Sequence, residues 1–519
     1  MKGNSLTAHS PQPHSPTLPD ALYHEVTGFV NNRMGLHFPI ARRSDLERGL
    51  HAAARQAGHR HVEPYVKWLL SAPLSKLQIE ELAGHLTIGE TYFLRNPEQF
   101  TLLEQQVLPE LIRQKQSDEK RLRIWCAGCS TGEEPYSVAI SLRRVIPDIA
   151  NWKITILATD INGRFLRQAE DACYSEWSFR NAPVWLKDGY FRRHGTDRWK
   201  LNAVIRNMVV FEHLNLAEDP YPSLVNNTSA MDIIFCRNVL IYFDAPHARK
   251  VASGFHRALL ETGWLFVGPT DTFIYQETEF GQAEDGHITC YRRRSPKIHH
   301  PLPEYHPTPI PVEASPFPYL TLHPVPPSSP PPARQTSTPS HTSPVHDPCK
   351  HALSLYQKGH YEEAITQLVG ELSKLESTPH LHEQTGQAMA LLARLYANLG
   401  RLKDSLDWCN RAILQDKVNP RYHYLQATIF QERGELNETR EALRRTLFLD
   451  QTLIIAQFAM GNVWRVAGKT VDARRHFKNA LGLLKQQART EVLPESDGLT
   501  AGRLEELVIS VLAEMEGTS

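Results

Sequence analysis

The stretch RIWCAGCSTGEEPYS, residues 123–137, decides the architecture of the first half of the chain. It opens with a short apolar run, Arg123–Cys126, and then passes through Gly128 and Gly132 into a helix-forming sequence. A buried strand followed by a tight turn and a helix is the opening unit of a doubly wound α/β sheet. The two glycines permit the turn and let the backbone come close to a ligand.

The polar residues of this turn restrict the kind of ligand. The turn is not GxGxxG, and it lacks the GKS/T ending of a phosphate-binding loop. Glu133 and Glu134 would repel a pyrophosphate, whereas they suit an ammonium or sulfonium group. The next apolar run ends at Asp160, where a carboxylate can accept both hydroxyls of a ribose. A nucleoside with a cationic tail fits these observations, although Asp160 alone would also suit a helix N-cap.

Strand-like runs alternate with helical patterns around this unit, which predicts a parallel sheet covered by helices. The runs are Arg123–Cys126, Lys153–Thr159, Val209–Phe211, Asp232–Cys236 and Trp264–Val267. Apolar residues at helical spacing before them predict helices over residues 20–115. Arg237 and Asn238 follow the fourth run abruptly, at the sheet edge where a site is expected. A charged turn without function would look the same.

The second half of the chain is a different kind of sequence. Of the 36 prolines, 17 lie between Pro296 and Pro348, and such a segment cannot bury enough apolar surface to fold. Beyond it, glycines recur with small residues seven positions before and five positions after each. These glycines are Gly359, Gly400, Gly434 and Gly468, and the last two intervals are both 34 residues. That period predicts tetratricopeptide-like helix pairs; an ordinary helical bundle is the alternative.

These patterns divide the chain into six segments. We expect a disordered N-terminus (1–19), a helical subdomain (20–115), the α/β domain (116–293), a Pro-rich linker (294–348), the repeats (349–485) and a capping helix (486–519). The fold class is therefore α/β and Rossmann-like, with an N-terminal helical subdomain and a C-terminal all-α tetratricopeptide-like solenoid.

Composition excludes several classes of function. Lys+Arg and Asp+Glu both total 57, so the net charge of zero gives no reason to expect a nucleic acid partner. The sequence has no signal-like or membrane-spanning apolar run, so we expect a cytoplasmic protein without membrane insertion. The seven cysteines are too scattered for a disulfide scaffold. Cys126 and Cys129 form a lone CxxC, which we interpret as buried residues beside a turn rather than as a zinc or redox site.

Five ordered motifs resemble those of the CheR-type chemotaxis receptor methyltransferases. They are LTIGETYFLRN (86–96), STGEEPYS (130–137), ATDI (158–161), NL (215–216) and FCRNVLIYFD (235–244). The resemblance covers roughly residues 20–293. It implies transfer of a methyl group from S-adenosylmethionine to glutamate side chains on the cytoplasmic helices of a methyl-accepting chemoreceptor-like protein. The tandem repeats further resemble those in methyltransferases of Wsp-like biofilm signalling systems, and they would bind a protein or peptide.

The resemblance also implies a role for each matched residue. The cofactor-binding set would be Thr91, Arg95, Glu134, Asp160, Asn215, Leu216, Arg237 and Asn238. Glu134, rather than Glu133, would hold the ammonium of the cofactor, and Asp160 would hold the ribose. Asn215 and Leu216 would frame the adenine. Arg95 and Tyr242 would form the reacting centre, with S-adenosylhomocysteine as the product and no metal.

The chain departs from the family pattern in three places. Some members bind the C-terminal tether of a receptor through a small β insertion; the corresponding segment here, Phe191–Phe211, is shortened, so we predict no tether binding. Gly89 stands where the family often has an asparagine, so one side-chain contact is missing. The early helix that is rich in arginine in the family keeps only Arg55 in residues 49–58, although Arg42, Arg43 and Arg48 precede it. Two other functions stay open: an inactive methyltransferase-like scaffold that acts through its repeats, and a small-molecule methyltransferase. The second lacks the NPPY-type motif of amino-group transfer.

Overall fold

The computed structural model describes residues 18–72, 74–115, 120–223, 226–272, 280–282, 289–293, 348–376 and 382–517. Nearly all of the N-terminal segment expected to be disordered, and the Pro-rich linker as far as residue 347, lie outside these ranges. Within the described part of the chain, no helix has the length and apolar character needed to cross a membrane.

The α/β domain is built on one seven-stranded sheet with the order β6-β2-β1-β7-β8-β10-β9. Its first five members in that order are parallel, and β10 and β9 are added antiparallel at one edge. The strands are β1 (Arg121–Ala127), β2 (Lys153–Asp160), β6 (Val209–His213), β7 (Met231–Cys236), β8 (Leu259–Val267), β9 (Phe280–Gln282) and β10 (Cys290–Arg293). The five predicted strands and the Rossmann-like fold are therefore confirmed. The strand order reverses between β1 and β7, the place where open α/β sheets bind ligands.

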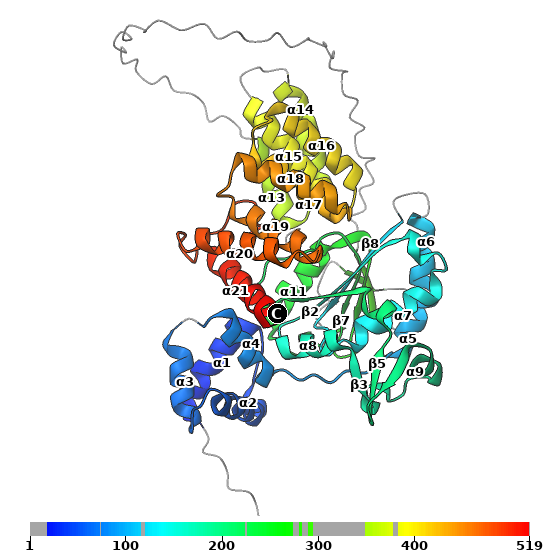
Figure 1. Cartoon of the computed structure of the whole chain (residues 1–519), viewed down its shortest axis with the longest axis vertical. Helices are drawn as coiled ribbons and strands as arrows, with labels where there is room; N and C mark the ends of the chain where they lie inside the picture. Colours follow the sequence, from blue (N-terminus) through cyan, green and yellow to red (C-terminus); the bar gives the residue numbers. More distant parts are fainter. Residues whose placement is uncertain are drawn as a thin grey trace, which may run out of the picture.

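Both faces of the sheet are buried. Successive residues of β1 point to opposite faces, so Ile124 and Cys126 enter one apolar cluster while Trp125 and Ala127 enter the other. The covering elements include α7 (Glu133–Val145), α8 (Gly163–Asp171), α9 (Val184–Tyr190), α10 (Ala203–Arg206), α11 (Ala245–Ala258) and the short η5 (Leu240–Tyr242). Figure 1 shows α7 and α11 on opposite sides of the strands.

The N-terminal helices form two groups. Helices α1 (Asp20–Met34), α2 (Arg43–Gln56), α3 (Val62–Ser71) and α4 (Lys76–Leu86) share a core of their own. By contrast, α5 (Pro97–Leu102), η2 (Leu103–Val107) and α6 (Leu108–Lys115) place Phe100 and Leu111 in the core of the sheet. By packing, residues 97–115 belong with the sheet, although their helical pattern groups them with the preceding helices.

A small antiparallel sheet lies beside the main one, and two of its strands fall in the segment where the sequence predicts a shortened β insertion. It has the order β3-β5-β4, from Cys173–Ser175, Arg198–Leu201 and Phe191–His194. Phe191 packs edge-on against Phe93 and Phe179. This apolar contact joins the small sheet to the segment between α4 and α5.

The C-terminal half is a stack of paired helices, which confirms the solenoid. The helices are α13 (Pro348–Lys358), α14 (Tyr361–Glu376), α15 (His382–Asn398), α16 (Leu402–Gln415), α17 (Pro420–Glu432), α18 (Leu436–Leu449), α19 (Ile454–Val466), α20 (Thr470–Leu484) and finally α21 (Ala501–Gly517). All four periodic glycines have φ between 71° and 81°, the left-handed turn between paired helices. The small residues at the repeat positions are buried where the helices cross.

The repeats are docked directly on the α/β domain (Figure 1). Glu432, at the end of α17, reaches the start of β1, where its Oε2 lies 2.5 Å from Arg123 Nη1 and 3.1 Å from Arg121 Nη2. The side chains of Arg123 and Glu432 are only 2% and 4% exposed. A buried ion pair therefore joins the two halves of the chain, beyond the covalent linker.

Candidate functional site

A cavity opens at the carboxyl edge of the parallel sheet, between it and the N-terminal helices. Its wall comprises Met34, Leu36, His37, Phe38, Arg42, Leu86, Thr87, Ile88, Gly128, Ser130, Asp160, Ile161, Phe165, Leu214, Asn215, Leu216, Asn238, Val239, Tyr242 and Phe243. Five of the predicted site residues are in this set: Asp160, Asn215, Leu216, Asn238 and Tyr242. The helical subdomain supplies one side of the wall, partly through Leu86, Thr87 and Ile88 of the motif at 86–96.

Asp160 is the buried carboxylate of this cavity. It ends β2, and each of its oxygens accepts one backbone N–H: Oδ2 from Ser130 at 2.8 Å and Oδ1 from Asn162 at 2.9 Å. Burial raises the pKa of Asp160 to about 6, against these hydrogen bonds. The backbone thus fixes the carboxylate, and each oxygen keeps a lone pair for a ligand.

The turn after β1 has the backbone that its glycines predict. Gly128 and Gly132 have φ of 76° and 92°, and a Cβ at Gly128 would lie 2.4 Å from Val239. Cys126 and Cys129 are buried, and burial raises the pKa of both thiols. These cysteines therefore pack beside the turn, as expected.

The two adjacent glutamates of α7 have different surroundings. Glu133 accepts hydrogen bonds from the hydroxyls of Thr131 at 2.6 Å and Ser178 at 2.8 Å, so both of its carboxylate oxygens have partners within the domain. Glu134 Oε2 lies 3.0 Å from Arg237 Nε in a buried ion pair. Burial raises the pKa of Glu134, and the charges of Arg237 and Arg95 oppose that rise. The structure thus gathers Glu134, Arg237 and Arg95 in one place, outside the residues that line the cavity.

Arg95 and Thr91 lie on the segment between α4 and α5, and both are half-buried. Arg95 Nη1 donates to the Glu90 carbonyl at 2.8 Å, and its guanidinium lies 5.7 Å from the centre of the Tyr92 ring. Thr91 accepts a hydrogen bond at its carbonyl from Arg180.

Tyr242 lies on η5 and contributes to the cavity wall. Burial raises the pKa of Tyr242, while the guanidiniums of Arg42 and Arg95 oppose the rise. Its carbonyl accepts the His37 N–H at 2.7 Å, and its ring lies 5.4 Å from the guanidinium of Arg42. These contacts join the loop after β7 to the helical subdomain and bring Arg95 and Tyr242 to the same region.

The loop after β7 is held by an aspartate that the sequence motifs missed. Asp271 is fully buried and accepts N–H groups from Asn238 at 2.6 Å and Ile241 at 3.0 Å. Asn238 itself has a φ of 58°, a conformation that asparagine tolerates better than most residues. The only signal for Asp271 is its position shortly after a predicted strand, in VGPTD.

Asn215 and Leu216 begin a turn beyond β6. Asn215 Nδ2 donates to the Arg33 carbonyl at 2.7 Å, and its Oδ1 accepts the Ala217 N–H at 3.0 Å. The side chain of Asn215 is thus used inside the protein, while its backbone and Leu216 face the cavity. The carboxylate of Asp219 closes this turn by accepting the Asn215 N–H at 2.6 Å.

The structure shows why a glycine suits position 89. A Cβ at this position would lie 2.5 Å from the Phe165 ring, which lines the cavity. An aromatic ring from α8 therefore occupies the space that a side chain at position 89 would need. A larger residue at position 89 would therefore require Phe165 to move.

The wall of the cavity carries polar atoms that need a partner. Ser130 Oγ and Asn238 Oδ1 are buried, and neither has a hydrogen-bond partner among the described residues. Buried polar atoms without a partner are costly, so such atoms in a cavity wall point to a polar ligand. Together with the buried carboxylate of Asp160 and the apolar Leu216, Phe165 and Val239, they fit a nucleoside.

Comparisons with known proteins agree with this geometry. The family model described as "CheR methyltransferase, SAM binding domain" matches residues 89–288. The chemotaxis protein methyltransferase of Borreliella burgdorferi is 31% identical over 245 residues, which cover 47% of this chain and 85% of that protein. Chemotaxis protein methyltransferase 1 of Pseudomonas aeruginosa is 37% identical over 37% of this chain and 69% of that protein.

A further relative matches this chain over less than half of its own length. The probable biofilm formation methyltransferase WspC of Pseudomonas aeruginosa is 30% identical over 203 residues, which cover 38% of this chain and 46% of that protein. The motifs, the sheet order and the matched region all coincide over the α/β domain. The chain belongs to the CheR family of chemotaxis protein methyltransferases and carries a domain for S-adenosylmethionine.

Proposed function

We propose that this chain transfers a methyl group from S-adenosylmethionine to glutamate side chains of a chemoreceptor-like membrane protein, for signal adaptation in chemotaxis or surface signalling. The observation that carries the proposal is the buried Asp160 carboxylate, fixed by two backbone N–H groups in a cavity that Tyr242 also lines. A carboxylate there recognises a ribose, and the reacting groups lie on the neighbouring segments.

The residues present fit the methyl donor, which supplies an electrophilic methyl group on a sulfonium. Asp160 accepts the ribose hydroxyls, and Leu216 with the Asn215 backbone holds the adenine. Glu134 takes the ammonium with the oxygen that its ion pair with Arg237 leaves free. Thr91 and Asn238 complete the set of contacts.

The substrate carboxylate needs no general base, because it is ionised at neutral pH. Arg95 orients this carboxylate through forked hydrogen bonds, and Tyr242 holds it from the cavity wall. Alignment of the reacting atoms in a dry site can supply roughly 7–11 kcal/mol at best. The positive charge of Arg95 must orient the carboxylate without suppressing its attack, so its geometry matters more than its charge.

Receptor docking involves α2. Arg48 and Arg55 are exposed on this helix, although Arg48 also pairs with Asp45, whereas the less exposed Arg43 pairs with Asp20 and Glu47. Exposed arginines on a helix of the subdomain that also supplies the cavity wall suit acidic receptor helices. Because few such arginines remain, we propose that the repeats supply additional contacts with a receptor or another signalling protein.

The decisive experiment is a methyl-transfer assay with membranes that contain candidate receptors. Labelled S-adenosylmethionine should yield labelled membrane protein that releases methanol in base, because esters are base-labile and other protein methylations are not. Membranes with the receptor glutamates changed to glutamine are the control. Folded protein that binds S-adenosylhomocysteine but gives no base-labile label would refute glutamate esterification. Protein that binds neither donor nor product would leave the inactive scaffold as the function.

Lowering the pH should weaken the binding of S-adenosylhomocysteine. Asp160 is ionised above its pKa of about 6 and accepts both ribose hydroxyls in that form. Protonation below pH 6 removes an acceptor, so the Kd should rise as the pH falls from 7.5 to 5.5. Asp160→Asn should weaken binding about 10–100-fold, which corresponds to the loss of a charged hydrogen bond, and flatten the pH profile.

Asp271 provides the internal check on this titration. Burial raises its pKa to about 6 as well, so it titrates in the same range while it holds the loop after β7. If Asp160→Asn retained the full pH dependence of the native protein, Asp160 would not be the group responsible, and Asp271 or Glu134, whose pKa burial also raises, would be. Calorimetric titrations at three pH values on both proteins make the comparison.

A cavity between the repeats and the α/β domain already contains part of the chain. Residues 491–500, here called the groove loop, lie between α20 and α21 and line this cavity of about 1370 Å³ together with α13, α15 and α17 of the repeats and with residues 218–222 and α11 of the α/β domain. Arg394 on α15 pairs with Glu495 and lies 3.6 Å from Asp497. The loop therefore presents two carboxylates to the repeats, which suggests that the partner segment is acidic.

Removing the two loop carboxylates should strengthen capture of an acidic peptide. A tethered loop competes at an effective concentration on the order of millimolar, so the native cavity should bind such a peptide weakly. We expect the labelled peptide LPESDGL to bind Glu495→Gln/Asp497→Asn about tenfold more tightly than the native chain, by fluorescence anisotropy. Adding Arg394→Met to that variant should abolish the gain. Equal, weak binding to all three proteins would mean that the cavity does not select acidic segments.

A further inference from the structure

The helix after the repeats touches the cavity region from outside the methyltransferase fold. Figure 1 shows α21, in red, running from the repeats to the N-terminal helices, and it packs against α4 as well as α20. A helix that only capped the solenoid would need to pack against α20. The packing of α21 against α4, which belongs to the helical subdomain, goes beyond that role.

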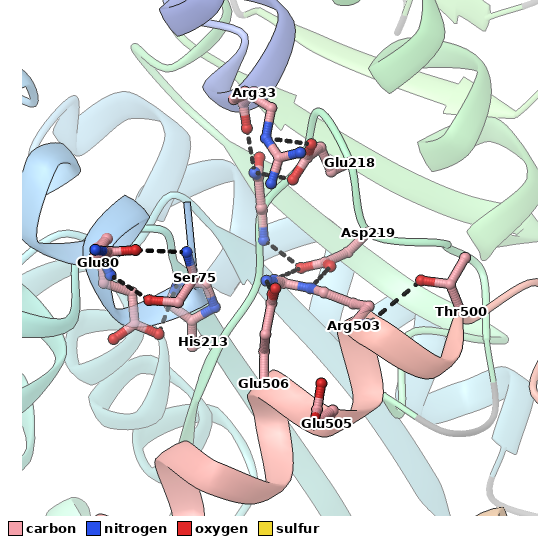
Figure 2. Close-up of polar contacts among 12 residues, drawn as sticks. Arg33, Ser75, Glu80, His213, Glu218, Asp219, Thr500, Arg503, Glu505 and Glu506 are labelled. Carbon is pink, nitrogen blue, oxygen red and sulfur yellow. Dashed lines mark hydrogen bonds and ion pairs between the residues drawn. The ribbon is translucent and has the colours of Figure 1, made fainter. Parts of the chain in front are cut away.

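Arg503 on α21 also contacts Asp219, in the turn that follows β6. Its Nε and Nη2 lie 2.6 Å and 2.8 Å from the two oxygens of Asp219, a forked arrangement (Figure 2). The two side chains are 12% and 9% exposed. A paired arginine and carboxylate in that geometry fix each other's orientation more firmly than an exposed pair does.

Asp219 transmits this contact to the cavity wall. The oxygen that accepts Arg503 Nη2 also accepts the Asn215 N–H at 2.6 Å, and Asp219 N donates back to the Asn215 carbonyl at 2.9 Å. The residues between them, which include Leu216, are thus held in one conformation. The position of the wall at Leu216 depends on a side chain nearly 290 residues away in sequence.

The surrounding charges make the contact depend on Arg503. Glu218 pairs with Arg33 of α1, while Glu506 lies 3.4 Å from Arg503 Nη1 (Figure 2). Without Arg503, the carboxylates of Asp219 and Glu506 would face each other with less positive charge between them. Repulsion would then favour movement of the turn or of α21.

We propose that α21 is part of the donor site, with Arg503 as a positioning residue that sets donor affinity through Asp219. This inference rests on the proposed function and adds a regulatory input to the same site. Since binding equilibria that share one element are coupled reciprocally, bound donor also holds α21 in place. The groove loop leads directly into α21, so a partner that moves this loop changes donor affinity.

Arg503→Met tests the proposal, because methionine keeps much of the side-chain volume without the charge. We expect the Kd of S-adenosylhomocysteine, by calorimetry, to rise about tenfold. At saturating donor the turnover number should stay within about twofold, because Arg503 contacts no reacting group. Arg503→Lys, which keeps the charge but loses the fork, should recover part of the affinity.

Arg489→Met is the matched control. Arg489 lies beside the same helix and pairs with Glu505 and Glu506, but the structure gives it no contact with Asp219. The Kd of S-adenosylhomocysteine for Arg489→Met should equal that for the native chain. If Arg503→Met and Arg489→Met both bound S-adenosylhomocysteine like the native protein, α21 would be a cap only, while the methyltransferase proposal would stand.

Hydrogen exchange at the Asn215 amide tests the coupling without any bound methyl donor. In Arg503→Met, the Asn215 amide should exchange faster than in the native chain and in Arg489→Met, because its acceptor is no longer fixed. Unchanged exchange at Asn215 would refute the coupling even if donor binding were absent altogether. Loss of donor binding by the native chain would instead refute the proposed function and, with it, the place of α21 in a donor site.

Discussion

Replacing Arg95 with alanine should reduce methyl transfer by about 100–1000-fold, the usual loss when a preorganised donor is removed from a reacting centre. Arg95 is half-buried, its charge acts on both Glu134 and Tyr242, and it donates a hydrogen bond to the Glu90 carbonyl. Little of the fold depends on that bond. The loss should therefore appear in transfer to receptor-containing membranes, with an unchanged melting temperature.

Two further variants separate orientation from charge. Arg95→Lys keeps the charge without the forked donors, so it should recover only a small part of the activity. Arg144→Ala removes a guanidinium that lies over the Trp185 ring and pairs with Glu104, away from the reacting centre. A partly exposed pair of this kind contributes about 0–1 kcal/mol, so the rate should fall fivefold at most. Substantial activity in Arg95→Ala would exclude Arg95 from the reacting centre.

Replacing Glu432 with alanine should lower the free energy of unfolding by about 3–5 kcal/mol, as when a buried ion pair loses one partner. Arg123 is almost fully buried at the start of β1, and burial lowers its pKa to about 10. Two of its hydrogen bonds go to Asn227, at 2.6 Å and 2.8 Å, and neither acceptor is charged. Without Glu432, a buried guanidinium would lack a carboxylate partner.

Denaturation in urea, followed by tryptophan fluorescence, measures this effect. Glu435→Ala is the control, since Glu435 pairs with Arg433 on the same repeat at a more exposed position and should cost under about 1 kcal/mol. Glu432→Gln keeps a hydrogen-bond acceptor, so its loss in the free energy of unfolding should lie between those of Glu432→Ala and Glu435→Ala. A loss below 1 kcal/mol for Glu432→Ala would mean that the repeats are not energetically coupled to the sheet through this pair.

Together, Glu432 and Arg503 give the solenoid two different roles. Glu432 reaches the amino-terminal end of β1, far from the reacting groups, and is expected to affect stability. Arg503 reaches the turn that begins at Asn215 and is expected to affect donor affinity. Measuring both quantities on both variants would show whether docking of the repeats and assembly of the donor site are separable.

The sequence was informative wherever a local pattern has one structural solution. The apolar runs became strands because both faces of the sheet are buried, and the glycines at 359, 400, 434 and 468 marked turns because only that residue adopts a positive φ at little cost. The sequence indicated only a shortened β insertion where the small antiparallel sheet stands, because strands of three or four residues are too short to show a clear alternating pattern. Helices α5 and α6 were grouped by their helical period, whereas their apolar side chains pack with the sheet.

By itself, the sequence determined the α/β sheet, the repeats, and the positions of Asp160, Glu134 and Arg95, because each follows from a short motif or a fixed period. Only the tertiary structure decided that Phe165 fills the space beside Gly89, that Asp271 holds the loop after β7, and that Glu432 and Arg503 dock the repeats. These contacts join residues far apart in the chain. Pairings of that kind are set by how the packed elements meet, and no local pattern in the sequence encodes them.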